Sequence, residues 1–535
     1  MDTARGQIRL RAPRDNGAVV AEPPLAEAGA LIARNRQRLG QLVGGLLGRT
    51  WADLRSQAIQ EALAAAQGYL RNAGEPLPQH RQPSLLLAGH QPELFHPGVW
   101  VKNFALHGLA ARHEATPINL IVDNDTAKAT ALRVPVPVEG DPQRYHVASV
   151  PFDRWSGEAP YEERAVRDES LFASLPQQMR RLTRGWGFVP LLEDLWPDVL
   201  RQVPRTPLLG ERLVAGRRAL ERRWGCHNLE LPVSVLCRTE SFAWFACHVL
   251  TNVPRFHAIY NACVQEYRRQ YGLRSRNHPV PDLARAGEWL EVPFWAWRAG
   301  QQERRRLFAR PSANGVELRA GEDAWPTLPS GSNGDAAVLV RAWRDLEQRG
   351  LKVRSRALTN TLFARIFIAD LFMHGIGGGK YDELTDAIMR RFYGIEPPGF
   401  LVLSATLLLP LPAYPARPED VQGLARRLRD LRYNPQRHLD GQALTSAAIH
   451  HLASQKQAWI SRHPAMAAER RERFHVLREL TDKLRGFVAG QEAEVRQHLL
   501  RSERELEANA VLHRRDYAFC LYPEALLSPF CTRFL

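Results

Sequence analysis

The stretch from Ser84 to Lys128 constrains the fold of this chain more than any other part of the sequence. The short apolar run Leu85–Leu87 is typical of a parallel strand that is buried on both faces. A polar turn and an amphipathic helical segment follow, and Ile118–Val122 forms a second apolar run. This order of strand, helix and strand predicts a βαβ unit, in which ligands bind beyond the carboxyl ends of the strands.

The composition is that of a globular protein with more than one domain. The chain has 535 residues, of which 44% are hydrophobic and 24% are charged. No window approaches the roughly 18 consecutive apolar residues of a transmembrane helix, and the N-terminus leads into no apolar signal segment. Six cysteines in so long a chain do not form a disulfide framework. We therefore expect a cytoplasmic protein that does not associate with membranes.

The net charge of +15 is a weak indicator of function. The excess is mostly arginine spread in short clusters, such as Arg304–Arg306, along the whole chain. Because an anionic substrate needs only a few of these side chains, we do not expect nucleic acid to be the partner.

The periodicities predict an α/β fold with a Rossmann-like parallel-sheet core, with insertions, and a C-terminal α-helical coiled-coil domain. The expected parts are an N-terminal helical segment (1–80), the core (81–414) with insertions at about 155–340, the coiled coil (415–514) and a tail (515–535) packing on the core. Strands are expected at Arg144–Val150, Leu231–Cys237 and Phe400–Leu409, and helices at Ser241–Gln270, Glu419–Tyr433, Ala443–Arg462 and about 464–514. Leu477, Leu480 and Leu484 step at helical spacing and predict an apolar seam that pairs two chains.

Three polar clusters could carry chemistry. The first is Gly89, His90, Gln91 and His96, which follow the first strand; imidazoles there can contact a phosphate or a developing charge, or simply cap the turn. The second is Asp123-Asn124-Asp125 after the next strand, which can bind a hydroxyl, an amino group or Mg²⁺, or form an Asx turn.

The third cluster is His374–Glu383, and its expected site residues are Gly377, Gly378, Gly379, Lys380 and Asp382. Glycines allow backbone N–H groups to approach a ligand, although the spacing is not that of a Walker A loop and a flexible interhelical loop is the alternative. Because the carboxyl ends of parallel strands lie at one edge of a sheet, we expect the three clusters to converge on one pocket. His90, Gln91, His96 and Asp125 are the expected catalytic residues, and the others bind substrate or nucleotide.

The cysteine and histidine residues between Cys226 and Cys263 contain no short chelating pair, so we predict no metal site there. The segment Trp289–Trp297 is rich in tryptophan, which favours a packed insertion or a pocket wall over a base-stacking platform.

Several of these stretches resemble the bacillithiol-biosynthesis cysteine-adding enzyme family. Residues 89–98 resemble its Gly-Gln-Gln-x-x-Leu-Phe-Thr-Gly-Pro motif, and 117–125 resemble its Pro-Val-Phe-Trp strand and acidic turn. Residues 378–382 and 392–398 resemble its Gly-Gly-Pro-x-Glu segment and following Phe-Gly-Ile-x-x-Pro, and 521–524 resemble its Leu-Phe-Pro tail. The departures lie in the active region: His90, His96, Thr126 and Lys380 replace the family's Gln, Thr, His and Pro.

The resemblance implies a core akin to class I nucleotidyltransferases and a coiled coil that forms a homodimer. It also implies a ligase that forms a C–N amide bond, as in the addition of cysteine to glucosaminyl malate. The expected ligands are an amino acid and an anionic acceptor, with ATP or ADP as the possible cofactor. The alternatives are an RNA-associated, tRNA-synthetase-like nucleotide-binding protein and a non-catalytic coiled-coil assembly protein.

Overall fold

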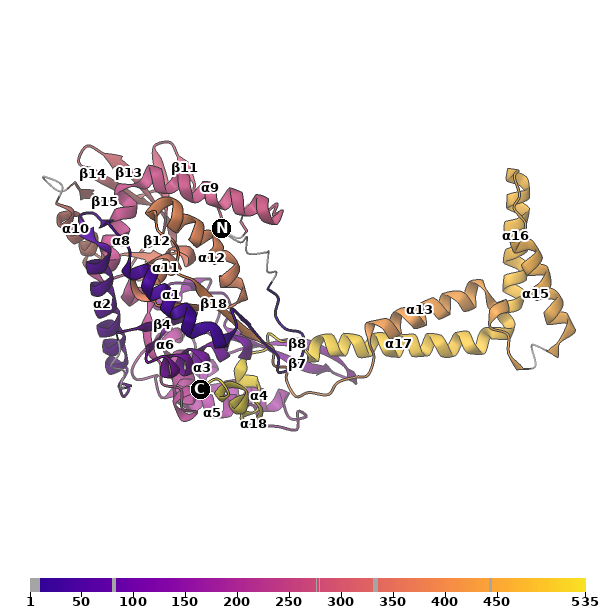
Figure 1. The fold of residues 1–535 in the computed structure, drawn as a ribbon. Coiled ribbons are helices and arrows are strands. Elements are labelled where there is room, and N and C mark those ends of the chain that lie inside the picture. The colour runs from indigo at the N-terminus through magenta and orange to yellow at the C-terminus, as the bar shows by residue number, and fades with distance from the viewer. Residues whose placement is uncertain (1–9, 79–82, 276, 279, 331–334, 442–444) are drawn as a thin grey trace. The chain divides into compact units, whose positions relative to one another are not determined.

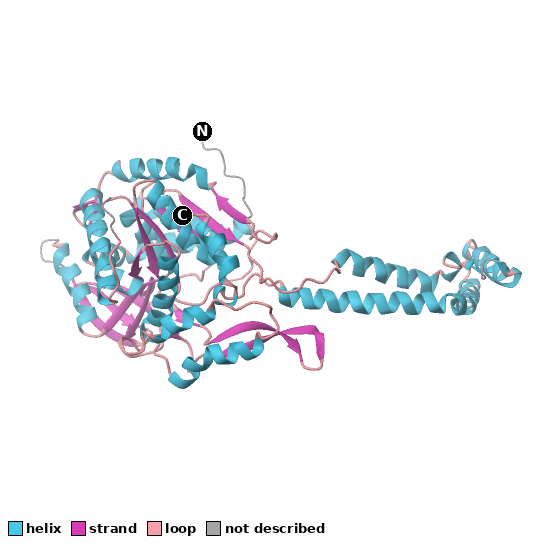
Figure 2. Cartoon of the chain, turned by 90° about the horizontal axis from the view of Figure 1, so that it is seen from below, coloured by secondary structure: helices cyan, strands magenta, loops and turns pink. Residues whose placement is uncertain are grey.

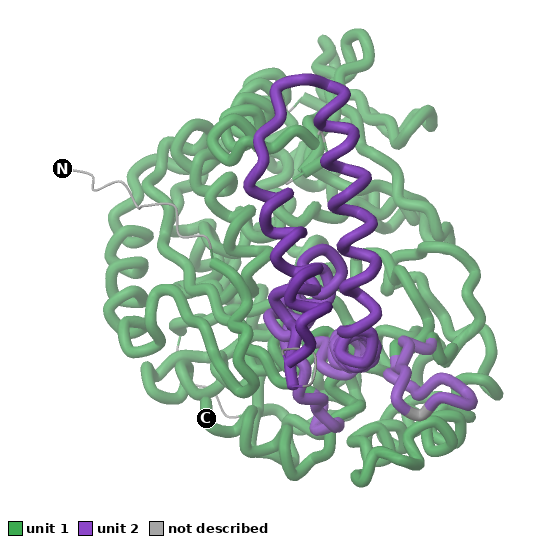
Figure 3. The backbone as a smooth tube through the Cα atoms, turned by 90° about the vertical axis from the view of Figure 1, so that its right-hand side faces the viewer, with its two compact units in different colours: residues 1–133, 149–408, 515–535 green, residues 134–148, 409–514 purple. Residues whose placement is uncertain are grey.

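The structure, a computed structural model, describes residues 10–78, 83–275, 277–278, 280–330, 335–441 and 445–535. It divides into two compact units, coloured separately in Figure 3. Unit 1 contains residues 1–133, 149–408 and 515–535, and unit 2 contains 134–148 and 409–514. The described parts of the expected N-terminal segment and C-terminal tail therefore belong to the same unit as the sheet core.

Unit 1 is built on a six-stranded sheet with the order β1-β18-β17-β4-β5-β10. Its strands are β1 (Val19–Glu22), β4 (Leu85–His90), β5 (Thr116–Ile121), β10 (Leu229–Pro232), β17 (Leu371–His374) and β18 (Phe400–Ala405). The neighbours from β18 to β10 pair in parallel, and β1 joins the β18 edge antiparallel. The expected α/β fold with a parallel-sheet core is confirmed.

Two crossovers leave the middle of this sheet in opposite directions. From β4 the chain passes through α3 (Pro97–Arg112) to β5, and from β17 it passes through α12 (Ile376–Ile388) to β18. Since β4 pairs with β17, the boundary between them is a topological switch point. Open α/β sheets bind ligands at such points, beyond the carboxyl ends of the strands.

Helices cover the sheet and complete unit 1 (Figure 2). They are α1 (Ala28–Gly40), α2 (Trp51–Asn72), α4 (Glu169–Leu182), α5 (Leu192–Leu200), α6 (Leu209–Arg223), α7 (Val233–Leu236), α8 (Glu240–Thr251), α9 (Val253–Tyr271), α10 (Ala336–Gln348), α11 (Ala357–Phe363) and α18 (Glu524–Thr532). The C-terminal tail packs on α3, where the backbone N–H of Phe519 donates to Phe95 and the ring of Phe519 lies 4.2 Å from that of Trp100.

Prolines explain two differences from the expected elements. The expected strand Leu231–Cys237 ends at Pro232, which cannot donate to the ladder, and the chain turns into α7. The expected helix Ser241–Gln270 divides into α8 and α9 because Pro254, at the start of α9, cannot continue the preceding helix. The expected strand at Phe400 ends at Ala405.

The tryptophan-rich segment forms part of a second, antiparallel sheet. This sheet has the order β11-β12-β13-β14-β15, with β16 on the other side of β12. Its strands are β11 (Arg285–Ala286), β12 (Trp289–Arg298), β13 (Arg305–Ser312), β14 (Gly315–Ala320), β15 (Asp323–Pro329) and β16 (Leu351–Ser355). Phe294 and Trp297 of β12 are buried, whereas Trp295 is half-buried.

Unit 2 is mainly helical. Its helices are α13 (Pro418–Tyr433), α15 (Ala447–Ile460), α16 (Ala467–Arg485) and α17 (Ala489–Leu512), and the start of the helix expected from Ala443 lies outside the described residues. The expected periodic segment at about 464–514 is interrupted by a 3-10 turn at Gly486–Val488. α13 and α17 lie side by side around Leu428, Leu431, Val488 and Val495 (Figures 1 and 2). Pairing of two chains as a coiled coil stays a prediction.

Short strand pairs complete the description: β2 (Gly45–Leu46) with β3 (Arg49–Thr50), β6 (Thr126–Ala127) with β9 (Ala159–Pro160), and β7 (Ala131–Val138) with β8 (Asp141–Pro151). β8 contains the strand expected at Arg144–Val150.

A buried ionic network joins the sheet edge to α6. Glu230 of β10 is 1% exposed and accepts hydrogen bonds from Arg217 and Arg218. Arg217 also pairs with Glu221 at 2.6 Å, and Glu221 in turn accepts a 2.6 Å hydrogen bond from the indole of Trp100 on α3. The guanidinium groups hold the pKa of Glu230 below its usual value despite burial.

We predict that Glu230→Gln lowers the free energy of unfolding by about 3 kcal/mol, because it leaves two buried guanidinium groups short of countercharge. Urea denaturation followed by circular dichroism measures the change. Glu288→Gln is the control: Glu288 pairs with Arg310 on the surface, and its loss should change stability by no more than about 0.5 kcal/mol. Equal effects of the two substitutions would contradict the assignment.

Candidate functional site

A cavity of about 670 Å³ lies at the topological switch point and is called the switch-point cavity below. His90 reaches it from the end of β4, and His374 from the end of β17. Other expected site residues that line it are Gly89, Gln91, His96, Gly377, Gly378 and Lys380. The structure thus places side chains about 290 residues apart in the sequence around one cavity.

Among the described residues that line this cavity, the ionisable side chains are basic groups or imidazoles, and none is a carboxylate. Besides the histidines, the ionisable side chains are Arg11, Lys102, Lys380 and Arg515. Clefts lined by charges of one sign concentrate counter-ions of the opposite sign. The cavity therefore suits an anionic ligand.

Lys102 is the most unusual of these side chains. It lies in the first part of α3 and is 4% exposed, and its Nζ is 3.5 Å from the carbonyl oxygen of Gly89. Among the described residues no carboxylate lies within ion-pair distance of Lys102. Burial lowers the pKa of this amine to about 8, because the charged form loses its hydration. A buried cation of this kind needs an anion, and the cavity provides the space for one.

Two helices begin at the cavity without a side-chain cap. α3 starts at Pro97 after His96, and α12 starts at Ile376 after Gly375. The N–H groups of a first helical turn have no partner within the helix, and the helix dipole favours an anion near them. Together with the buried amine of Lys102, these N–H groups make the end of the sheet a polar cradle for a phosphate or carboxylate.

The glycine-rich segment is the first turn of α12, whereas the sequence suggested a loop. A Cβ on Gly378 would lie 2.8 Å from Nδ1 of His374, and one on Gly379 would lie 2.4 Å from a methyl carbon of Val402. These glycines therefore let α12 pack closely on β17 and β18. Gly377 has open space around it, so it is the glycine that leaves room for a ligand.

His90 and His96 are neutral hydrogen-bonding groups at the cavity. Burial, and after it the charge of Lys102, lowers the pKa of His90 to about 3. Burial and then Arg515 lower the pKa of His96 to about 4. His96 Nδ1 is buried without a partner, and His90 Nδ1 lies 3.1 Å from the carbonyl oxygen of Gln91. A neutral imidazole still has one N–H group that can donate a hydrogen bond to an anion. The lowered pKa values are therefore compatible with the expected role of His90 and His96.

His374 and Asp382 form a buried pair at the end of β17. Nε2 of His374 lies 2.8 Å from Oδ2 of Asp382, which also pairs with Arg365. The charge of Arg365 lowers the pKa of Asp382 strongly, although burial opposes it. Asp382 therefore orients His374, and its carboxylate is not free to bind the nucleotide or substrate that the sequence suggested.

The acidic turn after β5 divides between two other cavities. Asn124 and Asp125 line a cavity of about 480 Å³, called the Trp295 cavity below, which shares Gln91 and Asn360 with the switch-point cavity. Gln91 Nε2 donates to Oδ2 of Asp125 at 2.9 Å, and Arg304 pairs with Oδ1 at 3.1 Å. Asp125 therefore lies beside the anion site and is connected to it through Gln91.

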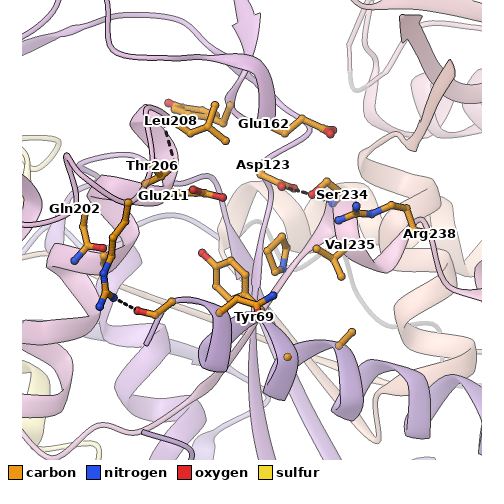
Figure 4. Close-up of a pocket in the computed structure, with 18 of the residues that line it drawn as sticks. Tyr69, Asp123, Glu162, Gln202, Thr206, Leu208, Glu211, Ser234, Val235 and Arg238 are labelled. Atoms are coloured by element: carbon orange, nitrogen blue, oxygen red, sulfur yellow. Dashed lines mark hydrogen bonds between the residues drawn. The ribbon is translucent and has the colours of Figure 1, made fainter. Parts of the chain in front are cut away.

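Asp123 does not join the predicted site. It lines a separate cavity, drawn in Figure 4, where Ser234 N and Oγ donate to its carboxylate. Burial, and then the charge of Glu162, raises the pKa of Asp123 to about 7. Five of the expected site residues are thus outside the switch-point cavity lining. Asn124 and Asp125 line the Trp295 cavity, Asp123 lines a third cavity, Gly379 packs against β18, and Asp382 is held in an ion pair.

Sequence reasoning missed Lys102 and Arg515, and it placed His374 at the start of the third cluster without giving it a role in the site. The signal for Lys102 was a single charged residue within the largely apolar run Val99–Leu109. His374 directly precedes the glycine-rich segment and follows the short apolar run Leu371–Met373. The carboxyl end of such a strand is where βαβ units place functional side chains. Arg515 comes from the C-terminal tail, and its position depends on tertiary packing alone.

Compared with protein-family models and with curated proteins, the sequence gives no match. Among the described residues, no three His, Cys, Asp or Glu side chains are grouped to hold a metal ion. In the same part of the chain, no helix has the length and apolar character needed to cross a bilayer. The six cysteines are free and buried.

We predict that Lys102→Met stabilises the unliganded protein by about 1–3 kcal/mol at pH 7, since it removes a buried charge that has no countercharge. The pKa of Lys102 is lowered in the folded state, so its cost is fully present below pH 8 and disappears as the pH rises towards the ordinary lysine pKa. Urea denaturation of both proteins from pH 7 to pH 10 should show the difference shrinking. A destabilised Lys102→Met protein would contradict the assignment.

Proposed function

We propose that this protein is an enzyme that binds a phosphate-bearing, nucleotide-type anion in the switch-point cavity. The observation that supports this most directly is the buried amine of Lys102, which faces a cavity whose described lining has no carboxylate. The uncapped N-termini of α3 and α12 add backbone donors to the same place. His96 and Lys380 lie at its edge and would contact the anion directly.

We further propose a ligase or nucleotide-activated transferase that forms a C–N amide bond, as the resemblance to the cysteine-adding family implies. In such a reaction an amine nitrogen attacks an acyl carbon, the bond from this carbon to a phosphate oxygen breaks, and the amine loses a proton. The Trp295 cavity adjoins the anion site, and Asp125 and Gln91 can orient the amine there. Lys102 and the helix N-termini would stabilise the charge on the leaving phosphate.

The geometry favours this reading over the two alternatives. An RNA-associated protein would use exposed arginines, whereas Lys102 is buried within a cavity that admits a small molecule. A non-catalytic assembly protein has no use for a buried cation that lowers stability. Measurement of RNA affinity at two salt concentrations separates the first alternative, because RNA binding falls steeply with salt.

We predict that ATP, ADP or inorganic pyrophosphate binds the pure protein, and that His96→Ala or Lys380→Ala weakens this binding about tenfold or more, because each change removes one contact to the anion. Lys102→Met should weaken it further. Isothermal titration calorimetry measures the affinities.

The control for Lys102→Met is Arg112→Met, at the exposed C-terminal end of the same helix. It should leave the affinity unchanged. If none of the three anions binds at millimolar concentration, or if the control weakens binding as much as Lys102→Met does, the proposed site is wrong.

We propose that the protein forms a homodimer through unit 2. Large apolar side chains of this unit are exposed, and the largest exposed fractions are those of Tyr433, Met466, Phe474 and Leu500 at 66%, 62%, 61% and 53%. Leu480 and Leu484 of the expected seam are already buried within the chain. The contacts between chains are therefore expected to use the exposed set, together with Phe487.

We predict a molar mass of about twice the 60.6 kDa of one chain in light scattering at micromolar concentration. The double substitution Phe474→Glu and Leu500→Glu should reduce the mass to that of one chain, because it places charges in the proposed apolar contact. A single-chain mass for the wild type would exclude the dimer.

A further inference from the structure

The cavity that contains Asp123 is distinct from the proposed active site. It measures about 610 Å³ and shares no lining residue with either the switch-point cavity or the Trp295 cavity. Its walls come from α2, α6, the turn after β5, the start of α7 and β16. Neither the resemblance nor the proposed function uses this cavity, which is named the Asp123 cavity here.

Three acceptor groups converge in the middle of this cavity (Figure 4): Asp123, Glu211 of α6 and the hydroxyl of Tyr69 on α2. Their proximity has an electrostatic consequence. Burial raises the pKa of Tyr69, the charge of Arg218 opposes this, and the charges of Glu230, Glu211 and Asp123 raise it further. Among the described residues, the carboxylate of Asp123 accepts hydrogen bonds from Ser234 only, and Glu211 has no ion-pair partner.

The basic groups of the cavity fall into two sets. The first set is neutralised within the wall: Arg354 pairs with Glu162 and Glu347, Lys352 pairs with Glu162 and Glu163, and Arg218 pairs with Glu230. The second set consists of Arg205 and Arg238, which are exposed at the rim. The guanidinium group of Arg205 donates to the carbonyl oxygen of Ala73, and among the described residues neither Arg205 nor Arg238 has an ion-pair partner. The cavity therefore offers acceptors at its centre and cationic donors at its edge.

We propose that the Asp123 cavity is a binding site for a small zwitterion of the α-amino acid class. The ammonium group lies among Asp123, Glu211 and the Tyr69 hydroxyl, where it satisfies two carboxylates that lack a cationic partner. The carboxylate of the ligand faces the rim, within reach of Arg205 or Arg238. Asp123 and Glu211 would repel a ligand that is only an anion, and the arginines at the rim would repel a polyamine. The pattern therefore selects a molecule with both charges.

The site is tested by ligand-observed NMR of the full chain with each of the standard L-amino acids at millimolar concentration. The best binder is then compared by calorimetry with its α-hydroxy acid and with its decarboxylated amine. Each analogue lacks one of the two charged groups, so each should bind about tenfold more weakly or worse. Absence of binding by every amino acid, or equal binding of the α-hydroxy acid, would overturn the proposal.

Substitutions assign the binding to this cavity. Asp123→Asn and Glu211→Gln should each weaken the best amino acid about tenfold or more, whereas Glu288→Gln, on the surface of the second sheet, should have no effect. Glu211 is exposed and makes no ion pair among the described residues, so its variant folds even if Asp123→Asn does not. Lys102→Met should leave this affinity unchanged, which separates the site from the proposed anion site. The assignment would be wrong if Lys102→Met lost amino acid binding while Glu211→Gln kept it.

The affinity should also depend on pH. The ionisable groups that face Asp123 are Glu162, Glu211, Tyr69 and, more distantly, Arg354. With a pKa of about 7, Asp123 is largely protonated at pH 6 and largely ionised at pH 8. Affinity for the ammonium group should therefore rise about tenfold over this interval in the wild type and stay nearly constant in Asp123→Asn. A flat profile in the wild type would contradict the role of Asp123.

Discussion

The parallel pairing of β4 with β17 is the contact on which the rest of the site depends. Three residues of β17, Leu371–Met373, pair in register with Leu86–Ala88 of β4. Because the two strands run in the same direction and their crossovers leave to opposite sides, the N-termini of α3 and α12 open at one place. No side chain needs to be specified for this polarity to arise, since it follows from the backbone dipoles and the topology. The side chains then decide which anion the place can hold.

Burial of Lys102 is the main energetic cost of this arrangement. Placing an amine in the interior without a carboxylate costs on the order of 3 kcal/mol, as judged from its lowered pKa. The nearby Glu230 and Asp382 show that the same fold pairs buried charges where they serve stability: each contacts guanidinium groups directly. Among the described residues Lys102 has no such partner, so its charge is available to a ligand. A bound anion would recover the lost stability.

The sequence was sufficient to locate the strands β4 and β5 and the polar residues that follow them, because buried parallel strands leave a strong apolar signal. It could not separate Asp123 from Asp125. Both follow the same strand, yet Ser234 binds one carboxylate and Gln91 and Arg304 bind the other, and these partners come from distant parts of the chain. Similarly, the glycines of α12 are explained by packing against Val402 and His374, which only the folded chain brings near.

The turn Asp123–Asp125 gives the two cavities beside it a physical connection. The carbonyl oxygen of Asp123 accepts from the backbone N–H of Glu162 at 2.8 Å, and that of Asp125 accepts from Tyr161 at 2.9 Å. The same short segment therefore holds both acidic residues through adjacent backbone bonds. Asp125 also contacts Gln91, which lines the switch-point cavity, so one short backbone segment positions a carboxylate beside each of the two proposed sites.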